Sequence, residues 1–143
     1  MKLEVKRAIY AKDKDAIHDI RTRVFMLELS VTLEEELDGL DESAMHVIAY
    51  ANGRPVGTAR LVELENGGGK IGRMAMLKEY RKKGAGTLML KKLVEMARAM
   101  GMRGLETDAR VKALPFYEAL GFVPEGPVFM DARMEHRKMR MKL

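Results

Sequence analysis

The stretch GKIGRMAMLKEYRKKGAGTLML, residues 69–90, carries the strongest structural signal in the chain. Residues 70–77 are mostly apolar and predict a strand near the centre of a sheet. A short basic segment containing Gly84 and Gly86 follows, and an apolar stripe with helical spacing begins at about residue 87. A strand, a basic glycine loop and an amphipathic helix in this order predict an anion-binding site.

The start of the predicted helix explains why this loop would bind an anion. The first backbone amides of a helix have no partner within the helix and carry the positive end of its dipole. Gly84 and Gly86 allow the backbone to approach a ligand closely and to adopt a positive φ. Hydrogen bonds to a charged group contribute roughly 1.5–3 kcal/mol each, so several amides with Arg81 would hold a pyrophosphate at about micromolar affinity.

Two common nucleotide motifs are absent from this stretch. A P-loop requires G-x-x-x-x-G-K-[ST], which no glycine cluster of the chain supplies. A dinucleotide fingerprint requires a third glycine at position 89, where the chain has Met89. The loop residues alone therefore leave two interpretations open, an anion site and a basic, solvated helix start.

The segments before this stretch alternate between strand and helix signals. Residues 3–9 predict a strand, and apolar residues at helical spacing predict a helix from an N-cap at Asp13 or Asp15 to about Glu28. The acidic segment 32–43, which contains Gly39, predicts a short helix and a loop. Two β-prone runs flank Asn52-Gly53 and predict a hairpin over residues 44–64.

The segments after it continue this alternation. The helix over residues 87–100 ends at Gly101. Its predicted buried stripe consists of Leu90, Leu93, Val94, Ala97 and Met100. A strand (103–108), a helix (112–120), a strand and turn (121–126) and a last strand to the C-terminus follow. We therefore expect an α/β or α+β fold with a mixed sheet and helices on both faces.

The composition indicates one soluble domain over residues 1–143. No apolar run approaches the roughly 18 residues that span a bilayer, and the N-terminus mixes charges into its apolar residues, unlike a signal peptide. The chain has no cysteine, which excludes a cysteine nucleophile, disulfides and a cysteine-based zinc site. Its three histidines show no metal-ligand spacing. We expect a cytoplasmic protein without a metal centre.

The net charge of +5 indicates attraction to polyanions but not to a particular one. The chain has no tryptophan, and its few tyrosines and phenylalanines are not interleaved with basic residues as a platform for stacking bases requires. We therefore expect a phosphorylated small molecule as the partner of the basic loop, and neither a nucleic acid nor a membrane.

Beyond these patterns, the chain resembles a known family. Residues 81–86, RKKGAG, match the [QR]-x-x-G-x-[GA] signature of the GNAT superfamily of acetyl-CoA-dependent N-acyltransferases. The segments RPVGTARL, GKIGRMAMLKEYRKKGAGTLML and LPFYEALGF resemble successive parts of that family in order and spacing. VFMLELSVTLEEELDGLDESAMH and MDARMEHRKM resemble a branch of small bacterial and archaeal members. The resemblance covers nearly the whole chain.

The resemblance implies a GNAT fold, with a mostly antiparallel mixed sheet that splays between its fourth and fifth strands. It implies transfer of the acetyl group of acetyl-CoA directly to a primary amine of a small molecule or protein, in a ternary complex. A non-catalytic module that binds or senses acyl-CoA is the alternative. Dimerisation is common in the family and cannot be read from these residues, so a homodimer stays open.

The same resemblance implies the residues that hold acetyl-CoA. The arm of the cofactor would pair with the backbone of Met74, Ala75 and Met76, and the Met76 amide would polarise the thioester carbonyl. The side chains of these methionines would be ordinary core. The pyrophosphate would be bound by the amides of the loop that Arg81 begins, namely Lys82, Lys83, Gly84, Ala85, Gly86 and Thr87.

Tyr117, with Phe116 beside it at the cofactor, aligns with the family's usual acid for the departing thiolate. The alternative is a tyrosine packed with Phe116 and Phe122. The base stays open between Glu28, Glu106 and a chain of waters.

On the acceptor side, the resemblance points to Glu28 and His136, although a lone histidine is as often structural. The acidic run over residues 34–42 would attract a cationic amine, but a solvated face explains it more simply.

Two positions depart from the family. Arg110 stands where an Asn or Gln commonly reaches the cofactor arm, so it would reach a phosphate or alter the acceptor chemistry. Leu29 replaces a frequent Gln of the branch. The acceptor amine cannot be inferred from the family, because a fold does not fix a substrate.

Overall fold

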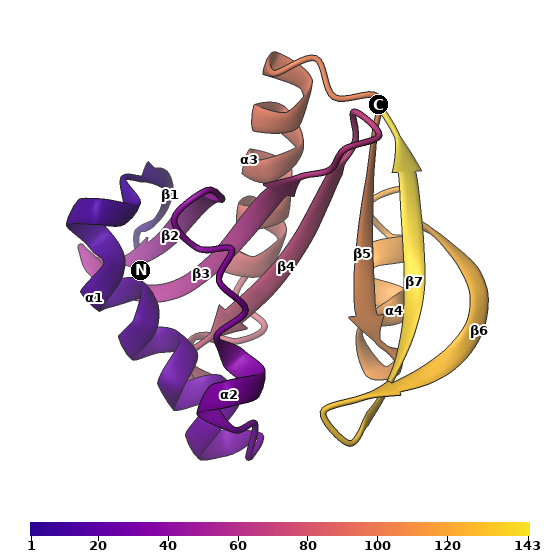
Figure 1. The fold of residues 1–143 in the computed structure, drawn as a ribbon. Coiled ribbons are helices and arrows are strands. Elements are labelled where there is room, and N and C mark those ends of the chain that lie inside the picture. Colours follow the sequence, from indigo (N-terminus) through magenta and orange to yellow (C-terminus); the bar gives the residue numbers. More distant parts are fainter.

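A computed structural model of the protein describes residues 1–143 and contains one seven-stranded sheet in the order β1-β2-β3-β4-β5-β7-β6 (Figure 1). The strands are β1 (Leu3–Ala8), β2 (Met45–Ala51), β3 (Arg54–Glu63), β4 (Gly69–Met76), β5 (Gly104–Arg110), β6 (Val123–Asp131) and β7 (Met134–Lys142). All neighbouring strands are antiparallel except β4 and β5, which are parallel. The predicted mixed, mostly antiparallel sheet is confirmed.

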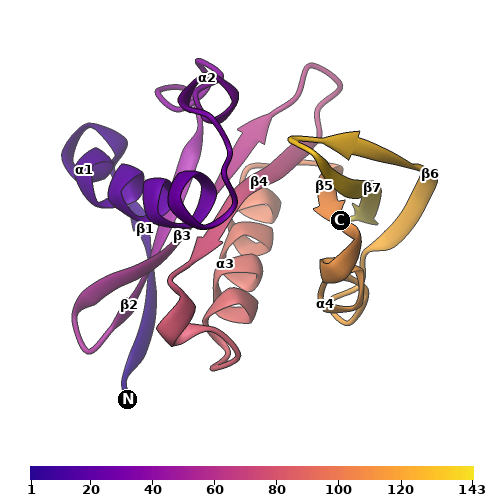
Figure 2. The same ribbon diagram turned by 90° about the horizontal axis from the view of Figure 1, so that it is seen from below.

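The helices cover both faces of the sheet, as predicted (Figure 2). On one face lie α1 (Tyr10–Arg21), its π-helical continuation η1 (Thr22–Glu28) and α2 (Leu33–Glu36). On the other lie α3 (Ala85–Ala99) and α4 (Leu114–Glu118). Short 3-10 turns, η2 (Lys78–Tyr80) and η3 (Val111–Ala113), precede α3 and α4. None of these helices has the length and apolar character needed to cross a bilayer.

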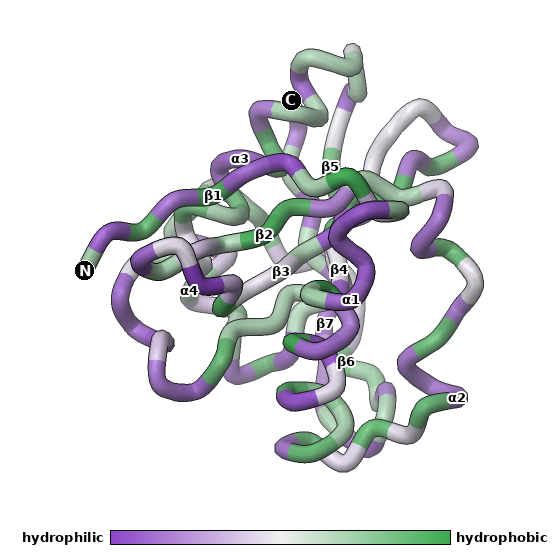
Figure 3. The backbone as a smooth tube through the Cα atoms, turned by 90° about the vertical axis from the view of Figure 1, so that its left-hand side faces the viewer, coloured by the Kyte–Doolittle hydropathy of each residue, from purple (hydrophilic) through white to green (hydrophobic).

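The hydrophobic core lies on both faces of the sheet, under α3 on one face and under α1 and η1, through Ile20 and Val24, on the other. Seven residues of α3 are buried, and they are Ala85, Met89, Leu90, Leu93, Val94, Met96 and Ala97. Apolar residues also follow β2, the second strand of the sheet (Figure 3). The predicted stripe of α3 is right except at its end: Met100 is 47% exposed, because it is the C-cap residue and the chain turns away at Gly101 (φ +75°).

Two other predictions about element ends are wrong. The first helix begins at Tyr10 rather than after an acidic N-cap, and the Asp13 carboxylate accepts a hydrogen bond from the Ile9 amide (2.8 Å) from within the helix. The predicted turn within 121–126 is part of β6, which continues to Asp131 and is irregular between Glu125 and Phe129. The Asn52-Gly53 hairpin is confirmed, with both residues at positive φ.

The feature that positions the site is the divergence of β4 and β5. They pair only at the start of each strand, through Ile71 opposite Thr107, and then separate (Figure 1). Against β3, β4 contains one extra residue between Gly72 and Ala75, and Arg73 there has a φ of +49°. Such a bulge bends a strand and increases its twist. The predicted splay is confirmed, and a bulge in β4 accompanies it.

Candidate functional site

A cavity of about 480 Å³ lies where β4 and β5 separate. Thr107 and Ala109 of β5 line it from the α4 side of the sheet, where Thr107 neighbours the Tyr117 hydroxyl. Asp108 and Arg110 also line it, and they face the α1 and α2 side because side chains alternate along a strand. Residues of η1, α2, α4 and the β6–β7 turn complete its walls. The cavity therefore passes through the sheet from one face to the other.

Tyr117 lies on the α4 wall of this cavity and is only 7% exposed. Its ring packs edge-to-face against Phe116 and Phe122, and its hydroxyl lies 3.9 Å from the sulfur of Met74. Burial raises the pKa of Tyr117 to about 12, although a hydrogen bond with Thr107 opposes the rise. The hydroxyl therefore stays protonated at neutral pH and can donate a hydrogen bond into the cavity.

The loop before α3 and the first turn of that helix present a row of free amides. None of the six backbone N–H groups from Lys82 to Thr87 donates a hydrogen bond to a protein group. Lys82 (φ +61°) and Gly84 (φ +90°) have left-handed backbones that shape the loop, and Gly84 is the N-cap of α3. Amides that lack partners at a helix N-terminus are suited to bind an anion. A Cβ at Gly86 would lie 3.5 Å from the Phe116 ring, so the loop adjoins α4.

Arg81 turns its side chain away from this loop. Its Nη1 and Nη2 donate to the two carboxylate oxygens of Glu28 (2.5 and 2.6 Å), and its Nε donates to the Met76 carbonyl (2.9 Å). The hydrogen bond from Arg81 lowers the pKa of Glu28, which weakens this carboxylate as a base.

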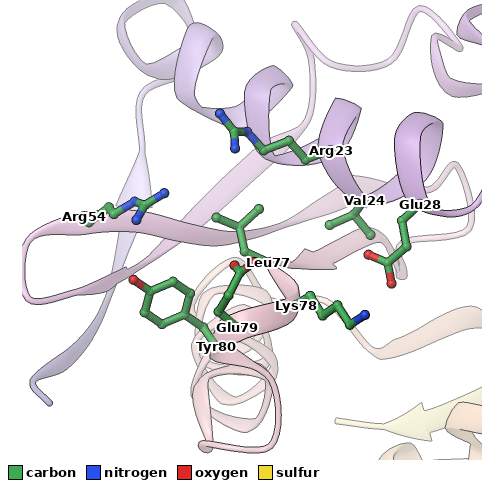
Figure 4. A pocket seen from close by; sticks show the side chains of 8 residues that line it. All are labelled: Arg23, Val24, Glu28, Arg54, Leu77, Lys78, Glu79 and Tyr80. Carbon is green, nitrogen blue, oxygen red and sulfur yellow. The ribbon is translucent and has the colours of Figure 1, made fainter.

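Glu28 lines a second cavity, of about 420 Å³, rather than the one that contains Tyr117. Glu28 and Lys78 lie toward one end of this second cavity, and Arg54 and Tyr80 lie toward the other (Figure 4). The Arg54 guanidinium lies 6.0 Å from the centre of the Tyr80 ring. The structure therefore does not bring Glu28 and Tyr117 together in one cavity.

Glu106 also lies outside the lining of the main cavity. At its position β4 and β5 are still paired, with Lys70 opposite Glu106, so the gap has not yet opened. Its carboxylate pairs instead with Lys138 (3.4 Å) and Arg140 (3.7 Å) of β7.

Arg110 and His136 do line the main cavity, opposite each other across β5 and β7. Arg110 is half-buried and makes no ion pair or side-chain hydrogen bond. His136 stacks on Phe129 (ring centroids 5.9 Å apart), and its Nδ1 lies 2.8 Å from the Met134 carbonyl.

The backbone of β4 beyond Ile71 has no strand on its β5 side. Ala75 and Met76 pair with β3 through Thr58 and Gly57. The side chains of Met74 and Met76 pack against the hydrophobic core, as expected, and Met74 also lines the cavity. This open edge is where an extended ligand could pair with the strand.

Sequence reasoning missed Asp108. One of its carboxylate oxygens pairs with Lys70 (2.9 Å), and the other is buried without a hydrogen-bond partner. Asp108 lies two residues after Glu106 on the same face of β5, already beyond the point where the strands separate. The alternation along this strand was visible in the sequence, but the point of divergence was not.

The acidic run in and after α2 is only partly the predicted solvated face. Glu34, Glu35, Asp38 and Glu42 are exposed, as predicted, but for two carboxylates the prediction is wrong. Glu36 and Asp41 are buried, with exposed fractions of 4% and 6%. Arg21 pairs with both, reaching Asp41 at 2.7 Å, and Arg60 contacts the same Asp41 oxygen at 2.9 Å. These carboxylates are therefore neutralised within the protein, because buried arginines from α1 and β3 lie beside them.

The chain is similar to known proteins over almost its full length. Residues 12–143 match the family model described as the acetyltransferase (GNAT) domain. The uncharacterised N-acetyltransferase YjcF of Bacillus subtilis is 34% identical over 137 residues, which cover 93% of this chain and 97% of that protein.

Solved structures share the fold at lower identity. An acyl-CoA N-acyltransferase from Pseudomonas aeruginosa has a TM-score of 0.87 at 23% identity, covering 98% of this chain and 99% of its own. Escherichia coli ElaA has a TM-score of 0.88 at 20% identity, covering 99% and 100%. The family match, the relative and the splayed sheet agree with the resemblance of the sequence, and the chain belongs to the GNAT acetyltransferase family.

Proposed function

We propose that the protein transfers the acetyl group of acetyl-CoA to a primary amine. The observation that carries this proposal is the row of six free amides, Lys82 to Thr87, next to a cavity that passes between β4 and β5. The row supplies donors for a pyrophosphate, and the cavity supplies a route from one face of the sheet to the other. A donor entering from the α4 side and an acceptor entering from the α2 side would meet within the sheet.

The chemical groups that these residues present suit the parts of coenzyme A. The loop amides would bind the pyrophosphate, and Gly84 and Gly86 leave room for it. The open edge of β4 at Met74, Ala75 and Met76 would pair with the amide groups of the pantetheine arm. The Met76 amide stays our candidate for polarising the thioester carbonyl. The side chains of Lys82 and Lys83 add positive charge, but the proposed pyrophosphate site does not depend on where these side chains point.

The chemistry of direct transfer needs no acyl-enzyme. The neutral amine attacks the thioester carbonyl carbon, a C–N bond forms, the C–S bond breaks and the sulfur leaves as a thiolate, while the proton that the nitrogen loses passes to a base or to water. A thiol has a reference pKa near 8.5, so full proton transfer from Tyr117 at about 12 would be uphill by roughly 5 kcal/mol. We therefore assign Tyr117 the role of a hydrogen-bond donor that stabilises the developing thiolate.

One observation favours the alternative, an acyl-CoA-binding module without turnover. Of the two carboxylates proposed as the base, Glu28 is held by Arg81 and Glu106 pairs with Lys138 and Arg140 outside the cavity. If no other group removes the ammonium proton, binding would not lead to reaction.

Two measurements test the proposal. Ligand at about 100 times its Kd adds roughly 2.7 kcal/mol of stability, which for a chain of this size raises Tm by roughly 5–10 °C. A protein whose Tm does not respond to saturating acetyl-CoA would exclude both CoA readings. Release of free thiol in the presence of a panel of amines supports the transferase, whereas binding without thiol release supports the sensing module.

A further inference from the structure

The cavity wall that faces α1 and α2 contains several charged side chains, and most of them are neutralised by a protein partner. Arg73 pairs with Asp38, and the carboxylates of Glu35 and Glu36 are paired with Arg133 and Arg21. Three charged groups that line the cavity keep unused capacity: one oxygen of Asp108, the guanidinium of Arg110 and the exposed carboxylate of Asp131 in β6. Asp108 and Arg110 lie on the same strand and have opposite charge.

Asp108 has room for one more donor. Lys70 pairs with one oxygen at 2.9 Å, while the other oxygen is buried and receives no hydrogen bond. Buried polar atoms without a partner are rare in folded proteins, because each loses its hydration without compensation. The Asp108 side chain is 26% exposed, and rotation about its soft χ2 exchanges the two oxygens. A cation in the cavity can therefore bind the Asp108 oxygen that Lys70 does not contact.

Arg110 presents a complementary group on the same wall. It is half-buried at the end of β5, two residues beyond Asp108 on the same face of the strand. The strand rise separates the two Cα atoms by roughly 6.6–6.8 Å. A guanidinium offers parallel N–H donors that match the two oxygens of a carboxylate.

Apolar side chains line the same cavity as these two charges. Phe25 and Leu29 come from η1 and the residue after it, Val31 from the segment before α2, and Met134 from the start of β7. A ligand held by both charges would therefore place its remaining atoms against hydrocarbon.

Resting on the proposed function, we propose that the acceptor is an amine that also carries a carboxylate, an amino acid with an apolar side chain. Its ammonium binds Asp108, and its carboxylate binds Arg110. Asp108 and Arg110 thereby determine specificity: a plain amine satisfies only the first, and an amide lacks the charge that the second requires.

The test measures binding to the protein loaded with CoA, in which no transfer can occur. The probes are L-leucine, L-methionine and L-phenylalanine, each compared by calorimetry with its amide and with the amine that lacks the carboxylate. At least one acid binds about tenfold or more tightly than its amide and its amine. Equal affinity within all three sets, or no binding by any acid, overturns the proposal.

Variants assign the two contacts. Arg110→Gln abolishes the preference for the acid, and Asp108→Asn weakens the acid and the amine alike. Arg137→Gln is the matched control, because Arg137 lies opposite Ala109 across β5 and β7 and donates to the Gly126 carbonyl. If Arg110→Gln keeps the preference but loses CoA affinity, Arg110 belongs to the donor site and the proposal fails.

Thiol release from acetyl-CoA with the same compounds separates this inference from the proposed function. Equal rates for acids, amides and amines would keep the transferase and overturn the inference. Selective binding of an acid without thiol release by any compound would keep the acceptor subsite and overturn the transferase.

Discussion

Arg81 holds Glu28 through both of its terminal nitrogens, at 2.5 and 2.6 Å, although 53 positions separate the two residues in the sequence. The Nε of the same guanidinium donates to the Met76 carbonyl at 2.9 Å. Arg81 therefore fastens the end of η1 to the end of β4. The side chain of Arg81 is thus used in holding these two segments together, while the backbone amides that follow it stay free.

Arg81→Ala, Glu28→Ala and the double variant form a cycle that measures this contact. Both side chains are 35% exposed, so the coupling energy in urea unfolding is about 1 kcal/mol or less. The CoA affinity falls in both single variants, because each releases the contact between Arg81 and Glu28, and it falls further in Arg81→Ala, which also loses the hydrogen bond to the Met76 carbonyl. A large loss of CoA affinity in Arg81→Ala alone, with no coupling to Glu28, would place the guanidinium on the pyrophosphate.

Comparing Gly84→Ala with Gly101→Ala distinguishes an effect of the loop backbone on CoA binding from a general loss of stability. Gly84 (φ +90°) and Gly101 (φ +75°) both have left-handed backbones and open space where a Cβ would lie. Alanine at either position costs roughly 1–2 kcal/mol in the free energy of unfolding. Only Gly84→Ala weakens CoA binding, because its φ sets the direction of the neighbouring amides. Equal CoA affinities for the two variants in calorimetry would contradict the assignment of this loop.

Gly86→Val tests the approach of the ligand to the same loop. Its Cβ would make an ordinary contact with Phe116 at 3.5 Å, so the variant folds with nearly unchanged thermal stability. The branched side chain crowds the space next to the free amides and weakens CoA binding by roughly tenfold or more. Unchanged affinity would refute the predicted pyrophosphate position.

Tyr117→Phe lowers turnover by about a hundredfold while leaving the Kd of CoA nearly unchanged, because the ring packing survives and only the donor is lost. The pKa of about 12 means that the hydroxyl stays protonated at every pH below about 11. The rate of the unaltered protein therefore shows no falling limb from this group up to that pH. A falling limb near pH 9 that disappears in the phenylalanine variant would contradict the role of Tyr117 as a protonated donor.

The parts of the fold that the sequence predicted are those with local signals. An apolar run, two glycines and an amphipathic stripe suffice to place β4, the glycine-containing loop after it and α3. The Asn52-Gly53 hairpin rests on the positive φ that these two residues tolerate. Each signal lies within a few residues of the structure that it specifies.

The parts that could not be predicted depend on contacts between distant segments. The burial of Glu36 depends on Arg21 of α1, and the burial of Asp41 depends also on Arg60 of β3. Whether Glu106 or Asp108 lines the cavity depends on where β4 separates from β5. A bulge in β4 at Arg73 accompanies this separation. A single sequence shows which residues alternate on a strand but not where its neighbour departs.

Asp38 makes the stability of the protein sensitive to acid. Burial alone would raise the pKa of Asp38, but hydrogen bonds and ion pairs, chiefly with Arg60, lower it to about 2 from an ordinary 3.8. Because the folded pKa is the lower one, the contribution is complete above about pH 4 and is lost as pH falls toward 2. It is at most about 2 kcal/mol after allowance for solvent screening.

Urea unfolding at pH 6 and pH 3 measures this contribution. The unaltered protein loses more stability between these pH values than Asp38→Asn does. Glu34→Gln is the control, because Glu34 is exposed and forms no ion pair, and it loses as much as the unaltered protein. An equal loss in all three proteins would mean that the protonation of Asp38 between pH 6 and pH 3 is the same in the folded and the unfolded protein.

Arg133 connects the β6–β7 turn to the segment around α2, and residues of both segments line the main cavity. From the β6–β7 turn, where its φ is +66°, its guanidinium reaches both carboxylate oxygens of Glu35 at 3.1 Å and the Ser30 carbonyl at 3.0 Å. The residue is mostly exposed, so Arg133→Ala leaves the Tm nearly unchanged.

With the acceptor entering from the α2 side, as proposed above, the loss of this bridge loosens the acceptor side alone, because the loop amides lie on the other side of the sheet. Arg133→Ala therefore changes the acceptor KM and admits bulkier amines, while the Kd of CoA stays the same. Arg137→Ala, on the neighbouring strand, changes neither constant. A variant of Arg133 with an altered CoA affinity and an unchanged acceptor KM would show that the bridge serves the donor side instead.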